Sequence, residues 1–146
     1  MKRMLLPLVV GLVLVAIAAA CGTPEPEPVE PTGPVEDHAG LVARLQARGA
    51  TVEAAGELTQ PFFSVDGQMV RVNGHDVQVF EYPTAAAAGS EAAQVLSDGS
   101  VIGTTMVNWA APPHFYRSGR LIVLYVGQDS GIIGLLEEVL GPQFAG

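Results

Sequence analysis

Apolar and polar residues alternate most clearly over residues 69–80, on both sides of the pair Asn73-Gly74. Asn-Gly between two alternating runs favours a hairpin with a two-residue type I′ turn, because both central residues of that turn need positive φ. The turn sets the strand register, so Arg71 is predicted to lie opposite Asp76 as a cross-strand ion pair. The other face of the hairpin is predicted to be apolar and to carry Val70, Val72, Val77 and Val79.

An almost wholly apolar run covers residues 120–126. Its lack of alternation predicts a central strand that is buried on both faces of a sheet. A shorter strand is predicted over residues 114–117, and a turn at Ser118-Gly119 joins it to the central strand. Two further strands are predicted, at residues 50–58 and 104–110.

Three segments carry the signals of helices. Each begins at a residue that can cap a helix N-terminus, namely Asp37, Thr84, and either Asp129 or Ser130. The first helix is predicted within residues 35–48 and the second from residue 85 to about residue 96. The third is predicted to end at Gly141-Pro142. Its buried stripe is predicted to contain Ile132, Ile133, Leu136, Val139 and Leu140.

The predicted element order is α-β-β-β-α-β-β-α. This order indicates an α+β fold, with an antiparallel sheet of about five strands and helices packed mainly on one face. The two hairpin turns are 45 residues apart, and each hairpin is followed by a capped helix. The architecture therefore hints at a repeated hairpin and helix unit.

The N-terminal segment has two cations, an apolar run over residues 4–20 and three alanines before Cys21. This is the layout of a secretory signal. The end of the segment resembles a bacterial lipobox, although Ala18 stands where that motif most often has leucine. The resemblance implies a lipoprotein signal peptide at residues 1–20, a diacylglyceryl group on the Cys21 sulfur, cleavage before Cys21, and acylation of the new amino terminus, for example by palmitate.

Two other interpretations of the N-terminal segment remain open. The alanines also fit an ordinary signal peptidase, which would release a soluble protein, and the apolar run is just long enough for an uncleaved anchor. Cys21 is the only cysteine of the chain. An exported protein with one unpaired thiol carries a reactive group, and acylation would remove it.

Charge and proline content divide the rest of the chain into a linker and a domain. Residues 21–34 contain Cys21 and a Pro- and Glu-rich run, which predicts an extended spacer reaching about 40 Å; a motif for a proline-binding partner is the alternative. Residues 35–146 are predicted to form one globular domain. Without the signal peptide the chain has five Arg against 15 Asp and Glu, a formal charge of −10. Such a chain should repel nucleic acid and anionic lipid.

Few residues indicate chemistry. The three histidines, His38, His75 and His114, lack the spacing of a metal site, and no motif for a nucleophile or a phosphate-binding loop is present. We therefore expect neither a metal, nor a cofactor, nor an enzymatic activity. The most suggestive segment is rich in aromatic residues and proline. If this segment is exposed, it would form a binding platform; if it is buried, it would be part of the core. The candidate binding residues of the segment are Trp109, His114, Phe115 and Tyr116.

These observations predict an extracytoplasmic, lipid-anchored protein of the cell membrane or outer membrane. Its domain is expected to bind an envelope protein, a peptide or a glycan, and no nucleic acid. The alternative is a small extracytoplasmic enzyme or inhibitor that uses the sheet face. An enzyme should bring His75 or His114 to an acidic partner in a pocket, whereas an interaction module should expose a flat or apolar patch.

Overall fold

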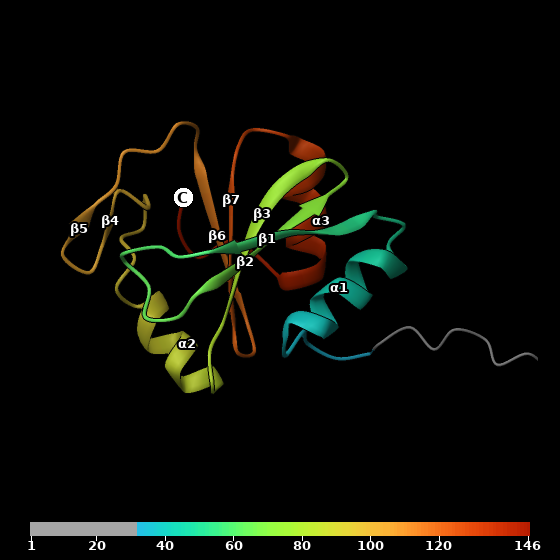
Figure 1. Cartoon of the computed structure of the whole chain (residues 1–146), viewed down its shortest axis with the longest axis horizontal. Helices are drawn as coiled ribbons and strands as arrows, with labels where there is room; N and C mark the ends of the chain where they lie inside the picture. The colour runs from blue at the N-terminus through green and yellow to red at the C-terminus, as the bar shows by residue number, and fades with distance from the viewer. Residues whose placement is uncertain (1–31) are drawn as a thin grey trace, which may run out of the picture.

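The computed structural model describes residues 32–146. The expected signal peptide, Cys21 and most of the expected linker lie outside these residues. The described part contains three helices and seven strands, and Figure 1 shows their arrangement. In chain order they are α1 (His38–Ala47), β1 (Val52–Leu58), β2 (Gly67–Val72), β3 (His75–Glu81), α2 (Ala85–Ala92), β4 (Val101–Ile102), β5 (Thr105–Met106), β6 (Pro113–Ser118), β7 (Leu121–Val126) and α3 (Ser130–Leu140).

Five strands form one antiparallel sheet in the order β1-β2-β3-β7-β6, and β4 pairs with β5 separately. The predicted α+β class and the predicted order of the main elements are therefore confirmed. The β2–β3 hairpin has the predicted register: Asn73 and Gly74 both have positive φ, at 49° and 85°, and Arg71 lies opposite Asp76. Arg71 Nε is 3.1 Å from Asp76 Oδ1.

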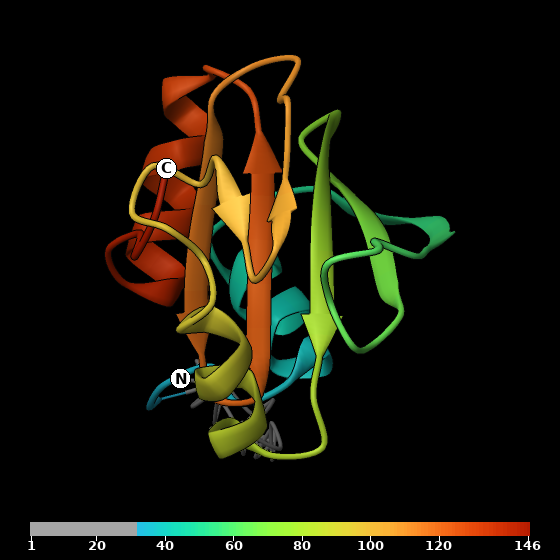
Figure 2. The same ribbon diagram turned by 90° about the vertical axis from the view of Figure 1, so that its left-hand side faces the viewer.

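The interior strand β7 separates two apolar cores, because alternate residues of a strand point to opposite faces. Leu121, Val123 and Tyr125 pack with α1 and α3 on one face, which we call the first face. Ile122 and Leu124 pack with α2 on the second face. Figure 2 shows the β4–β5 hairpin lying over the sheet on this second face. The helices that follow the two hairpins, α2 and α3, thus lie on opposite faces, so the suggested repeat is limited to the hairpins themselves.

The structure differs from the prediction between residues 93 and 112. Helix α2 ends at Ala92, because Val95 instead forms a bridge with Ile102 and the Leu96 N–H donates to the Val101 carbonyl at 2.9 Å. The strand predicted at residues 104–110 is reduced to β5. Gly103, with φ of 59°, reverses the chain so that β5 pairs with β4. Local propensity here gives way to pairing with a neighbouring segment.

The two edges of the sheet are protected in different ways. The C-terminal segment covers part of β6, where the Phe115 N–H donates to the Ala145 carbonyl at 2.9 Å. Strand β1 forms the other edge, and its pairing with β2 is interrupted by an irregularity between Ala54 and Gly56. It also exposes Glu53 and Glu57. Bulges and charges discourage another strand from pairing with an edge.

Candidate binding surface

The four candidate residues of the aromatic segment do not share one surface. Phe115 and Tyr116 are consecutive residues of β6, and both are fully buried, on opposite faces of the sheet. Trp109 is partly exposed beside the second core, where its ring packs edge-on against Phe62 and Phe115. Its indole N–H donates to the Gly99 carbonyl at 2.8 Å. Trp109 therefore ties the loop before β6 to the turn before β4.

His114 is held by a stacking contact on one face of its ring and by a contact at each ring nitrogen. It stacks on Tyr125 with a centroid distance of 6.0 Å and an interplanar angle of 21°. Its Nε2 lies 3.0 Å from the Gly127 carbonyl, and its Nδ1 lies 2.7 Å from Gln143 Oε1. Because a carbonyl oxygen only accepts, Nε2 must carry a proton and donate it. These contacts are those of a histidine that joins β6 to the chain segments after β7 and α3.

His75 lies against the same Tyr125 ring, with a centroid distance of 6.3 Å. Its Nε2 is 3.8 Å from Asp129 Oδ2, which is beyond hydrogen-bonding distance, and both side chains are about half exposed. Asp129 has a structural role as well, since its carboxylate accepts from the Ile132 N–H at 2.9 Å and caps α3. Across residues 32–146, no group of three or more His, Cys, Asp and Glu is placed to hold a metal ion.

Two buried tyrosines have hydroxyl groups without a hydrogen-bond partner among the described residues, Tyr82 and Tyr116. Burial raises the pKa of Tyr82 above its ordinary range, with a smaller contribution from the charge of Glu91. Burial also raises the pKa of Tyr116 to about 12, with smaller contributions from Glu137 and Tyr125. Both phenols therefore keep their protons at neutral pH, and they act as parts of the core.

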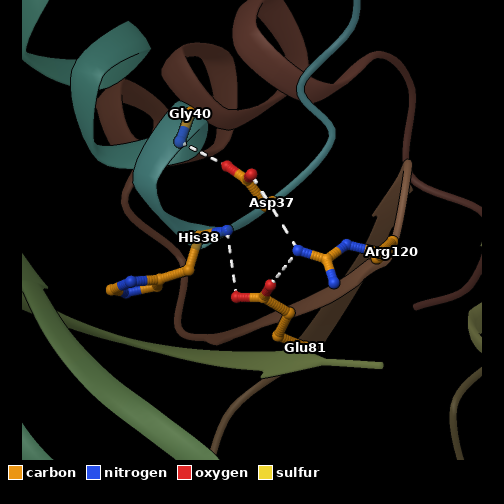
Figure 3. Close-up of polar contacts among 5 residues, drawn as sticks. All are labelled: Asp37, His38, Gly40, Glu81 and Arg120. Carbon is orange, nitrogen blue, oxygen red and sulfur yellow. Dashed lines mark hydrogen bonds and ion pairs between the residues drawn. The ribbon is translucent and has the colours of Figure 1, made fainter. Parts of the chain in front are cut away.

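A polar cluster connects the start of the domain to the end of β3 and to the β6–β7 turn (Figure 3). Arg120 Nη2 lies 2.5 Å from Glu81 Oε1 and 3.9 Å from Asp37 Oδ2. The second oxygen of Glu81 accepts from the His38 N–H at 3.3 Å. Asp37 caps α1 by accepting from the Gly40 N–H at 2.8 Å. One arginine thus connects the helix cap, the end of β3 and the β6–β7 turn.

Two hydrogen bonds to backbone carbonyls of the entering chain reinforce this cluster. The Arg120 N–H donates to the Glu36 carbonyl at 2.9 Å, and Ser118 Oγ donates to the Val35 carbonyl at 2.7 Å. Gly119 has φ of 51°, and a Cβ at this position would collide with Glu36 Cα. We call the contacts of Ser118, Gly119 and Arg120 with Val35 and Glu36 the N-terminal clasp. It fixes the direction in which the chain enters the domain at Val35.

The second face carries an exposed apolar row. Met106 is 84% exposed and Leu96 is 52% exposed, and they are the two large exposed hydrophobic residues of the described part. Val101 pairs with Met106 and accepts a hydrogen bond from the Leu96 N–H. Directly opposite residues of neighbouring strands point to the same side, so Leu96, Val101 and Met106 form one row. Ile102 points the other way and is buried in the second core.

One acidic residue lies beside the apolar row. Asp98 lies in the turn between Leu96 and Val101, and its carboxylate accepts from the Ser100 N–H at 2.9 Å and from Ser100 Oγ at 2.7 Å. These hydrogen bonds lower the pKa of Asp98. The chain between residues 82 and 112 contains Glu91 and Asp98 but no Lys, Arg or His. The charged residues of the segment that contains the row are therefore all acidic.

Sequence reasoning missed this row because β4 and β5 are two residues long each, too short to show a period. The available signal was the pair of apolar groups on either side of Gly103-Thr104.

Comparisons of the chain with protein-family models, with curated proteins and with solved structures found no match. Among the described helices, none has the length and apolar character needed to cross a membrane.

Proposed function

We propose that this chain is an extracytoplasmic lipoprotein that is anchored through Cys21, and that its domain binds a partner in the cell envelope rather than catalysing a reaction. The proposal joins the lipobox-like sequence to the surface of the domain. His75 and His114 have contacts that account for their positions, and Tyr82 and Tyr116 pack within the two cores. No contact within the described part of the domain explains why the apolar side chains of the row are exposed.

The observation that carries the binding proposal is the exposure of Met106. A methionine side chain gains about 1.5–3 kcal/mol when it is fully buried, and the domain leaves this one almost entirely in water. Leu96 lies in the same row, on the segment that is hydrogen-bonded to β4. Apolar side chains that gather on a surface in this way are typical of contact sites for other molecules.

The N-terminal clasp supports the tethered part of the proposal. A domain on an extended spacer presents its surfaces in a defined direction only if the last residues of the spacer are fixed to it. Here the clasp holds Val35 and Glu36 against the β6–β7 turn. The exposed row is thereby held in a constant direction relative to the chain that enters at Val35.

Metabolic labelling with an alkyne-bearing fatty acid tests the anchor. The wild-type chain should incorporate the label and lose its signal peptide, whereas Cys21→Ser should do neither. Ser130→Ala is a matched control that leaves Cys21 intact and should be labelled like the wild type. Equal labelling and processing of Cys21→Ser would refute the lipid anchor.

A further inference from the structure

The apolar row points to a more specific partner than an envelope component in general. This inference rests on the proposed binding function and concerns the chemistry of what binds. We propose that the row formed by Leu96, Val101 and Met106 docks a segment of another protein that carries apolar side chains flanked by Lys or Arg. Three kinds of observation support it: the shape of the row, its charge, and the poor fit of other occupants.

The row offers a small apolar contact. Neighbouring strands lie about 4.8 Å apart, so three side chains on β5, on β4 and on the segment at Leu96 that pairs with β4 span about 10 Å. That length matches one or two apolar side chains of a bound polypeptide. The row is also firmly supported, because Ile102 on the reverse side of the same strands is buried in the second core. A partner therefore meets a surface that is already formed.

Charge selects among the polypeptides that this row would accept. Asp98 lies in the turn between Leu96 and Val101, and the Ser100 hydrogen bonds favour its ionised carboxylate. Like charges across an interface oppose binding and opposite charges favour it. The flanks of the bound segment should accordingly be basic.

Two other occupants fit less well. A membrane surface offers apolar depth, but its anionic head groups would be repelled by a chain whose formal charge without the signal peptide is −10. A second copy of this chain would bring the same negative charge to the contact.

Fluorescence anisotropy with defined peptides tests the proposal on the full chain in phosphatidylcholine nanodiscs. One probe alternates valine with lysine, and the second alternates valine with glutamate. The lysine peptide should bind and the glutamate peptide should not. Met106→Gln and Leu96→Gln should each weaken binding of the lysine peptide about tenfold. Ala43→Gln, an exposed substitution on α1, should leave it unchanged. Asp98→Asn should weaken it about threefold and reduce its salt dependence.

Several outcomes would overturn the proposal. They are absence of binding by the lysine peptide, equal binding of both peptides, and binding that Met106→Gln leaves intact. Binding of the wild type, but not of Met106→Gln, to phosphatidylglycerol vesicles instead of the peptide would assign the row to lipid. Sedimentation showing a dimer that Met106→Gln dissociates would assign it to a second copy. Fatty-acid labelling at Cys21 is independent of these results, so the anchor can stand while the partner class fails.

Discussion

Replacing Gly119 by alanine tests the close approach at the centre of the N-terminal clasp. Gly119 has φ of 51°, a left-handed conformation that costs alanine about 1 kcal/mol more than glycine. Its Cβ would also collide with the backbone of Glu36. Because the collision is with backbone and not with a flexible side chain, the segment before α1 must move away.

The size of the effect follows from the contacts that this movement removes. The Arg120 N–H loses the Glu36 carbonyl, and Ser118 Oγ loses the Val35 carbonyl. Each hydrogen bond contributes about 1 kcal/mol, so Gly119→Ala should lower the free energy of unfolding by about 3 kcal/mol. Gly74→Ala is the matched control, because Gly74 has φ of 85° and open space around its Cβ position. It should cost only about 1 kcal/mol.

Urea unfolding followed by Trp109 emission measures both variants on a chain without residues 1–21. Trp109 is the only tryptophan, and it packs at the edge of the second core. Under two-state unfolding, the difference between the two variants is the contribution of the clasp, about 2 kcal/mol. If the two variants lost the same stability within about 0.5 kcal/mol, the contact between Gly119 and Glu36 would not have the structural role assigned to it.

Three further predictions concern the core, a cap and pH. Ile102→Ala should cost about 2–4 kcal/mol in urea unfolding, whereas Met106→Gln should change stability by less than about 0.5 kcal/mol because its side chain is exposed; similar losses would contradict the row. Asp37→Ala should cost about 1 kcal/mol through the lost cap of α1, and an unchanged urea midpoint would contradict that role. Burial raises the pKa of Tyr116 to about 12, while an unfolded tyrosine ionises near pH 10. Stability should therefore fall as pH rises from about 10 to 12, and Tyr116→Phe should lessen the fall; an equal fall in both would refute the assignment.

The sequence predicted the elements whose signals are local. The β2–β3 register follows from Asn73-Gly74, since the turn chemistry alone decides which residues face each other. The N-termini of the helices follow from Asp37, Thr84 and Asp129, and each of these side chains accepts from a backbone N–H of the first helical turn. The buried position of β7 follows from its continuous apolar run.

The features that could not be predicted depend on residues far apart in the chain. The clasp joins Glu36 to Arg120, and no local pattern marks either residue for the other. The apolar row depends on the pairing of Leu96 with β4 and of β4 with β5, which replaced the end of a predicted helix and most of a predicted strand. The aromatic segment was recognised as a unit, but strand alternation sends Phe115 and Tyr116 to opposite cores.

The clasp also determines how the domain would bear a mechanical load. A pull on the chain before Gly33 first meets the hydrogen bond from Arg44 of α1 to the Gly33 carbonyl, and then the hydrogen bonds from Ser118 and Arg120 to the next residues of the chain. Ser118 and Arg120 border the turn that leads into β7, an interior strand with a neighbour on each side. Beyond the Arg44 contact, tension is therefore passed to an interior strand of the sheet before it reaches the backbone of α1. We expect the domain to resist stretching from its N-terminal end better than its small size alone would indicate.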